Sequence, residues 1–120
     1  LEPPWAARQR WRSPQWLYHL ALPDEWQDAR QQGSYQRSTR GRSLQEEGFI
    51  HLSGAHQLEA THGRFYADLD HVVLLTVDPH RLPSDQLKWE AIPTGEQFPH
   101  LYGALPLDAV LSADRYRAEP

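Results

Sequence analysis

The sequence predicts a single α+β domain, and three observations support this fold class. The chain has 120 residues, the length of one domain with one hydrophobic core. Helix-like and strand-like segments come in mixed order, with strands gathered late in the chain, which disfavours a doubly wound parallel sheet. The chain contains no cysteine, so neither disulfides nor cysteine-bound zinc can stabilise the fold.

The domain is expected to span residues 16–120, preceded by an N-terminal arm or linker over residues 1–15. The arm contains three Pro and two Trp without a hydrophobic period. The domain opens with "WLYHLA", whose alternation predicts a strand with Leu17 and His19 on one face.

A helix should follow this strand. Pro23 suits a first helical position, and Gly33 suits the residue after a helix end. The polar segment 33–43 should be a loop. Ser43 and Glu46 have the spacing of a capping box, which predicts a short helical turn after that loop.

The segment "FIHLS", residues 49–53, predicts a strand whose centre is a histidine. A buried strand would normally carry Val or Ile there, so His51 faces either the protein interior or a ligand. Its two apolar neighbours should face the core. Ser53 is then expected to cap a helix over residues 55–66.

The second half should be rich in strands. The continuous apolar run "HVVLLTVD" predicts the centre of a sheet. Further strands are expected over residues 87–92 and 107–116, with a loop over residues 93–106 between them.

Charge and hydropathy exclude some function classes. The net charge is −4 and no segment is uniformly basic, so duplex nucleic acid is not expected as a partner. RNA is not the expected partner either, although strong salt-dependent retention on RNA would support RNA binding. No apolar run approaches the ~20 residues that cross a bilayer. We expect a soluble, cytoplasmic protein.

Two strand histidines are the leading candidates for chemistry. His19 and His51 could line one cleft, with Ser53 beside the second, or each could be a half-buried residue bonded to the backbone. Glu90 follows a Trp on a predicted strand, where desolvation could make it a general acid or base. Alternatively, Glu90 is a solvated residue paired with Lys88.

Two further groups could bind a ligand. His100 and Tyr102 share one face of a Pro- and Gly-flanked loop, which is either a binding loop or an aromatic plug over the core. Three arginines in the polar loop could hold phosphates or could simply be solvated: Arg37, Arg40 and Arg42.

Several standard motifs do not occur. There is no GxxxxGK[ST] or GxGxxG phosphate loop and no GxSxG nucleophile elbow. Despite seven histidines, no HExxH or other known metal spacing is present, so no metal site is expected.

A set of motifs in fixed order resembles one protein family over residues 16 to about 114. The family is the bacterial and plant domain-of-unknown-function family numbered nine hundred and fifty-two. The motifs that carry the resemblance are "LYHLA", "DEWQDARQQGSY", "SLQEEGFIHLS", "RFY", "VVLLTVDPHRL", "KWE" and "FPHLYGALPLDAV".

That family is similar to the ADP-ribosyltransferase fold, which implies split, mixed β-sheets around an NAD cleft. By this resemblance His19 is the first-strand histidine of the site, and His51 with Ser53 comes from a second strand. The resemblance further implies a glutamate on a late strand, with Glu90 as first candidate and Glu96 as second.

We therefore consider an ADP-ribosyl- or nucleotide-handling enzyme, with NAD as the candidate substrate or cofactor. Three aromatic side chains could stack on a base: Tyr66, Phe98 and Tyr102. The alternatives are a non-catalytic module that binds a small anionic or nucleotide-like ligand, and a histidine-based acid–base enzyme acting on another small molecule.

Overall fold

The computed structural model describes residues 16–117, which form the α+β domain that the sequence predicts. The expected arm over residues 1–15 lies outside the described residues. Within this range the strands form antiparallel sheets of three, two and three strands. Their orders are β1 (Leu17–Ala21), β4 (Val72–Val77), β8 (Val110–Tyr116); β2 (Ser34–Tyr35), β7 (Leu105–Pro106); and β3 (Ile50–His51), β6 (Gln97–Leu101), β5 (Leu87–Ala91).

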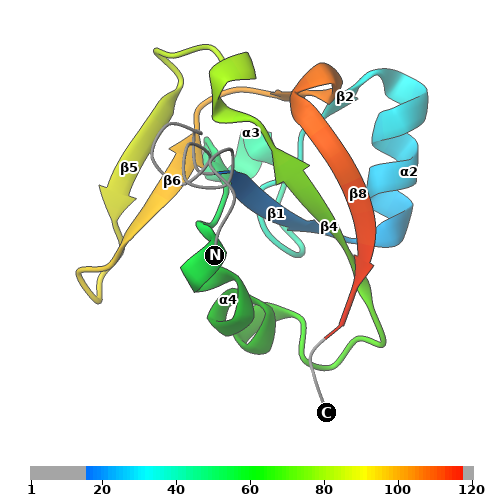
Figure 1. Cartoon of the computed structure of the whole chain (residues 1–120), viewed down its shortest axis with the longest axis horizontal. Helices are drawn as coiled ribbons and strands as arrows, with labels where there is room; N and C mark the ends of the chain where they lie inside the picture. The colour runs from blue at the N-terminus through cyan, green and yellow to red at the C-terminus, as the bar shows by residue number, and fades with distance from the viewer. Residues whose placement is uncertain (1–15, 118–120) are drawn as a thin grey trace, which may run out of the picture.

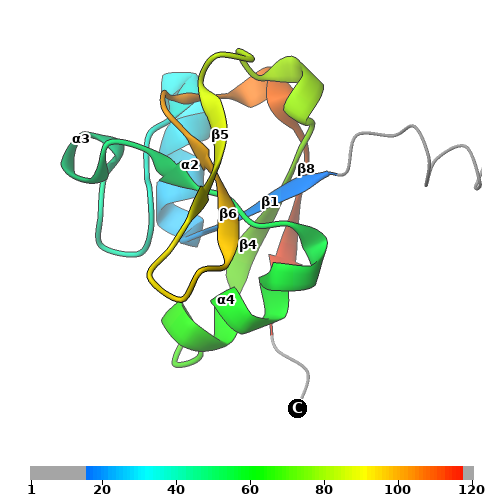
Figure 2. The same cartoon turned by 90° about the vertical axis from the view of Figure 1, so that its left-hand side faces the viewer.

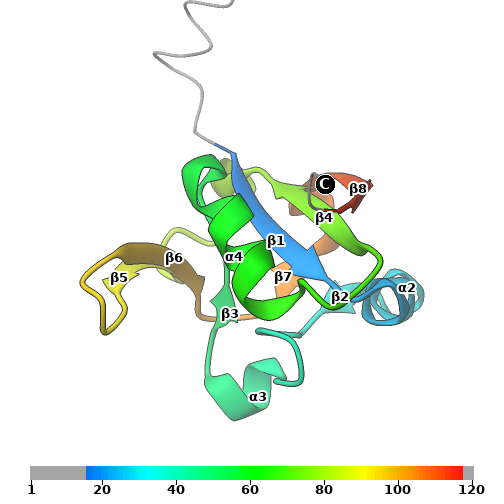
Figure 3. The same cartoon turned by 90° about the horizontal axis from the view of Figure 1, so that it is seen from below.

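Short helices connect the sheets. They are α2 (Pro23–Gln32), α3 (Leu44–Glu47), α4 (Leu58–Phe65), and the 3-10 turns η1 (Ala55–Gln57), η2 (Pro79–Arg81) and η3 (Leu107–Ala109). Figure 1 shows α2 on the side of the molecule opposite the β5–β6 hairpin. In Figures 2 and 3, α4 lies across one end of the domain, beside β1.

The helix ends follow the expected sequence signals. Helix α2 begins at Pro23, and it ends where Gly33 adopts a φ of 90° and donates its N–H to the Ala29 carbonyl at 2.8 Å. The capping box of α3 is present: Ser43 Oγ accepts from the Glu46 N–H at 3.2 Å, and Glu46 Oε1 accepts from the Ser43 N–H at 2.9 Å.

The main core lies around β4, the central strand of the first sheet. Leu75 and Val77 are fully buried, as the continuous apolar run predicts. They pack with apolar residues from β1, β3 and β6, including Ile50 and Leu101. Ile50 and Leu52, the apolar neighbours of His51, are both buried in this core, as the alternation of segment 49–53 predicts.

A single β-bridge joins the first and third sheets. Tyr18 donates its N–H to the Ser53 carbonyl at 2.8 Å, and Ser53 donates its N–H to the Tyr18 carbonyl at 2.7 Å. This bridge brings the segment around His51 alongside β1, and therefore alongside His19.

Three sequence-based expectations are wrong. The segment expected as a loop over residues 33–43 contains the two-residue strand β2, which pairs with β7. The segment expected as a loop over residues 93–106 contains β6, the central strand of the third sheet, with a proline in it. Pro99 has no N–H to donate, but its carbonyl accepts from the Leu52 N–H at 3.0 Å and its ring is buried. Ser53 does not cap a helix, because its backbone is occupied by the bridge to Tyr18 and η1 begins beyond Gly54.

Candidate functional site

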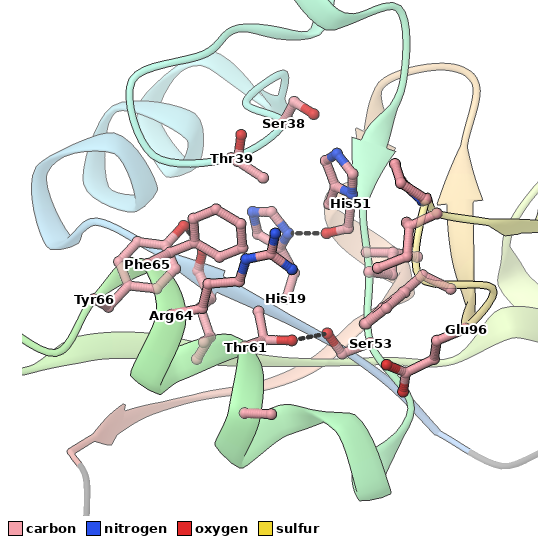
Figure 4. Close-up of a pocket in the computed structure, with 16 residues that line it drawn as sticks. His19, Ser38, Thr39, His51, Ser53, Thr61, Arg64, Phe65, Tyr66 and Glu96 are labelled. Atoms are coloured by element: carbon pink, nitrogen blue, oxygen red, sulfur yellow. Dashed lines mark hydrogen bonds between the residues drawn. The ribbon is translucent and has the colours of Figure 1, made fainter.

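A pocket of about 240 Å³ lies where β1, β3, α4 and the turn before β6 meet (Figure 4). Its apolar walls come from Leu20, Leu52, Ala60, Phe65, Ile92, Pro93 and Phe98. Its polar lining comes from His19, Ser38, Thr39, His51, Ser53, Thr61, Arg64, Tyr66 and Glu96. The structure thus places both strand histidines at one pocket, together with four more of the sequence candidates: Ser53, Tyr66, Glu96 and Phe98.

His19 lines this pocket from β1, but its two ring nitrogens are already engaged. Nδ1 lies 2.6 Å from the main-chain carbonyl of His51 and must donate to it, so Nε2 accepts from the Tyr35 hydroxyl at 2.8 Å. The ring is 4% exposed, and this burial lowers the pKa of His19 to about 4. At neutral pH His19 is therefore a neutral, fixed part of the pocket wall.

His51 lines the pocket from β3 and is only half-buried. Burial, followed by the nearby His100, lowers the pKa of His51, while Glu47 opposes that shift from 3.8 Å. His51 is therefore neutral at physiological pH and can accept a proton from a bound molecule.

Hydroxyl groups line the space beside the two histidines. Ser53 Oγ lies 3.3 Å from Thr61 Oγ1 on α4. Ser38 Oγ is buried and has no hydrogen-bond partner within the described part of the chain. The Tyr66 hydroxyl donates to the Leu20 carbonyl at 3.3 Å, and burial raises the pKa of Tyr66 to about 12, so this hydroxyl stays protonated.

One cation and one carboxylate complete the lining. Figure 4 shows Arg64 reaching from α4 into the space between Phe65 and His51. Its guanidinium lies 5.4 Å from the centre of the Phe65 ring, and it makes no ion pair among residues 16–117. Glu96 Oε2 accepts from Gln57 Nε2 at 3.1 Å. Sequence reasoning missed Arg64 as a site residue, although Ala60, Thr61, Arg64 and Phe65 follow the period of one helix face.

Glu90 is not part of this pocket. One of its carboxylate oxygens accepts from His100 Nδ1 at 2.8 Å and from the Tyr102 hydroxyl, and these bonds, led by that to Tyr102, lower the pKa of Glu90. Glu90 and the pair His100 and Tyr102, which the sequence offered as separate candidates, thus form one cluster on the third sheet. Glu96, the second choice for the late-strand glutamate, lines the pocket instead.

The three loop arginines do not converge on a common phosphate site. Each faces a carboxylate on a different element: Arg37 pairs with Glu25 at 3.4 Å, Arg42 with Glu47 at 3.7 Å, and Arg40 with Asp68 through two contacts. Arg40 also donates to the Phe65 carbonyl at 3.1 Å, which ties the loop to the end of α4.

No group of three or more metal-ligating side chains within residues 16–117 could hold a metal ion. No helix in this range is both long and apolar enough to cross a bilayer.

Three solved structures, all of protein CC0527 from Caulobacter crescentus, are similar to this chain. The crystal structure is 32% identical, covers 87% of this chain and 88% of that chain, and superposes with a TM-score of 0.76. A crystal structure of a double mutant is 31% identical over the same shares, also with a TM-score of 0.76. The solution NMR structure is 33% identical, covers 84% of each chain and has a TM-score of 0.70.

No curated protein matches the chain. One family model does, over residues 20–113, and its description is "Protein of unknown function (DUF952)". This span includes the cluster around Glu90 and every pocket-lining residue except His19, which directly precedes it, and it confirms the family that the sequence motifs resemble. The chain therefore belongs to the DUF952 family.

Proposed function

We propose that the pocket binds a nucleotide of the ADP-ribose type and that the protein is an ADP-ribosyl- or nucleotide-handling enzyme. One observation carries the proposal: a single pocket combines an aromatic and aliphatic wall with hydroxyls, a guanidinium that pairs with no carboxylate of residues 16–117, and a separate carboxylate. A flat base, a ribose and a phosphate require these groups together.

Each part of such a ligand has a counterpart in the lining. Phe65 or Phe98 offers a ring face for a base. The Ser38 hydroxyl, which has no partner among the described residues, offers a hydrogen bond to a sugar. Arg64 is exposed, so it suits a phosphate at the mouth. A cavity of about 240 Å³ fits one nucleoside unit, with the phosphates directed outward.

A relationship to the ADP-ribosyltransferase fold belongs to the same proposal. Two sheets meet at the bridge between Tyr18 and Ser53, and the pocket lies beside that junction. The family resemblance leads us to expect a ligand at such a junction. The first-strand and second-strand histidines, His19 and His51, both come to it.

The proposed reaction replaces nicotinamide at the ribose of NAD. The bond from the anomeric carbon to the nicotinamide nitrogen breaks, and its electron pair leaves with nicotinamide. An acceptor, water in the simplest case, bonds to that carbon and gives its proton to neutral His51. The Glu96 carboxylate stabilises the positive charge that develops on the sugar.

Calorimetry with ADP-ribose and NAD, together with an assay of NAD loss over a day, tests the proposal. We expect Arg64→Gln to weaken ADP-ribose binding by about 10-fold or more, because a charge-assisted contact is lost. Arg30→Gln, an exposed arginine on α2, is the matched control and should bind as the wild type does. No heat at millimolar ligand and no NAD loss would remove the proposal.

A non-catalytic module is the second candidate, and the state of His19 favours it. Both nitrogens of that ring are bonded to protein groups, so neither is free to hold a ribose hydroxyl. If ADP-ribose binds and His51→Ala abolishes the binding, while no NAD is consumed, the pocket recognises its ligand without chemistry.

A further inference from the structure

Four aromatic rings form a cluster on the third sheet: Phe49, His51, His100 and Tyr102. Phe49 stacks on His100 with ring centres 4.1 Å apart and meets the edge of His51 at 4.7 Å. His51 and His100 are directly opposite each other in the β3–β6 pair, with ring centres 4.9 Å apart and planes at 81°. Of the four rings, only His51 lines the pocket.

Glu90 holds this cluster from the neighbouring strand β5. It accepts from His100 Nδ1 at 2.8 Å, and the same oxygen accepts from the Tyr102 hydroxyl. Because a carboxylate only accepts, Nδ1 of His100 must carry a hydrogen, which fixes the orientation of that ring. His100 is 5% exposed, and its Nε2 has no partner among the described residues.

The charged and titratable groups around the two histidines come from four elements. His51 faces Glu47 from α3 at 3.8 Å and His100 from β6, and its carbonyl accepts from His19 on β1. His100 faces Glu90 from β5, and Lys88 on the same strand lies 5.5 Å from the centre of the Tyr102 ring.

We propose that Glu90 and His100 are positioning residues that fix the His51 ring at the edge of the pocket and keep it neutral near pH 7. The His51 and His100 rings lie 4.9 Å apart, so like charges on the two rings would repel each other, and this repulsion disfavours protonation of His51. Glu90 keeps the His100 ring in place for this effect. The proposal extends the proposed function, in which His51 accepts a proton, but its test needs no ligand.

The first test follows the imidazole nitrogens of the ligand-free protein by NMR through a pH titration. We expect His100→Gln to raise the titration midpoint of His51 by about half a pH unit or more, because the like-charge repulsion between the two rings is removed. His80→Gln, an exposed histidine in η2, is the matched control and should leave that midpoint unchanged. An unchanged or lower midpoint in His100→Gln would overturn the proposal.

A second pair of variants keeps the test decisive if His100→Gln does not fold. Glu90 has a side chain that is 39% exposed, so its replacement should be tolerated. Glu90→Ala should release His100 from its Nδ1–H form, which the ring nitrogen shifts report, and should move the His51 ring signals. Glu90→Gln keeps an acceptor oxygen and should restore the wild-type form. If Glu90→Ala changes neither histidine, the positioning role is wrong.

These results are independent of nucleotide binding. If NAD and ADP-ribose fail to bind while His100→Gln still shifts His51, the proposed function fails and the positioning role stands. If ADP-ribose binds and the His51 midpoint does not respond to His100→Gln, the positioning role fails alone.

Discussion

At the scale of single residues, His19 shows how a pocket residue can also be a stability determinant. Its ring is neutral because burial removes water from the charged form and because Tyr35 and the His51 carbonyl fit the neutral ring. Protonation would place a second N–H against the Tyr35 hydroxyl, which must then reverse its own hydrogen bond. The folded state therefore binds a proton at His19 far less readily than the unfolded chain does.

This imbalance predicts an acid-sensitive fold. The pKa of His19 falls from 6.5 to about 4 on folding, so the unfolded state binds more protons between these values and stability falls as the pH drops through that window. Between pH 7 and pH 5 the free energy of unfolding should decrease by about 2 kcal/mol through His19. Urea unfolding at the two pH values measures this loss.

The control for that prediction is a comparison of variants. His19→Gln should be less stable at pH 7 and should show a smaller decrease between pH 7 and pH 5. His80→Gln, whose ring is exposed, should keep the full decrease. An equal decrease in His19→Gln would show that other groups cause it.

The strand pattern predicted part of the site at this scale, and turn geometry decided the rest. Alternation placed His51 away from the core, and the bridge then brought it to the same pocket as His19. The choice between Glu90 and Glu96 could not be read from the sequence. It depends on the turn at Gly95, with a φ of 93°, after which Glu96 meets Gln57.

At the scale of elements, the loop over residues 36–43 is tied to α4. Within the loop, the Ser38 N–H donates to the Arg42 carbonyl at 2.9 Å. Arg40 reaches Asp68 through both terminal nitrogens and the Phe65 carbonyl through one of them. The loop and α4 carry opposite walls of the pocket, so this tie sets their separation.

We expect Arg40→Gln to loosen the loop without unfolding the domain. The pair is exposed and screened by solvent, so its loss should hardly change the free energy of unfolding. Hydrogen exchange of the Ser38 and Arg42 amides should nevertheless become faster than in wild type. Arg30→Gln is the matched control, and unchanged exchange in Arg40→Gln would contradict the role of the tie.

Sequence reasoning missed the short strands β2 and β7 and, more importantly, the central strand β6. Three prolines and two glycines in residues 93–106 are typical of a loop, and a proline argues against a central strand. The strand forms because Leu101 is fully buried against the core and because Pro99 contributes its carbonyl alone to the β3 side. Tertiary burial outweighed local propensity here.

At the scale of the whole molecule, β4 organises the fold because it pairs with a strand on each side. Leu75 on this strand is fully buried in the main core. Leu75→Ala should lower the free energy of unfolding by about 2–5 kcal/mol, because it removes buried surface and leaves a cavity. Leu111→Ala, at a residue 43% exposed on β8, should cost much less. Chemical denaturation of both variants measures the difference, and equal losses would contradict this assignment of the core.

The sequence was most informative about this central strand and about α2 and α3. Their signals are local: an unbroken apolar run, a proline at a helix start and a capping box. The arrangement of the sheets was not predictable, because it depends on long-range contacts such as that between Tyr18 and Ser53.

The bridge between Tyr18 and Ser53 has one more consequence. It is a narrow seam between two larger sheets, and the hollow beside it has walls from both. A ligand bound in that hollow would contact both sheets at once and hold them together. Occupancy should therefore make the domain harder to melt, whatever chemistry follows.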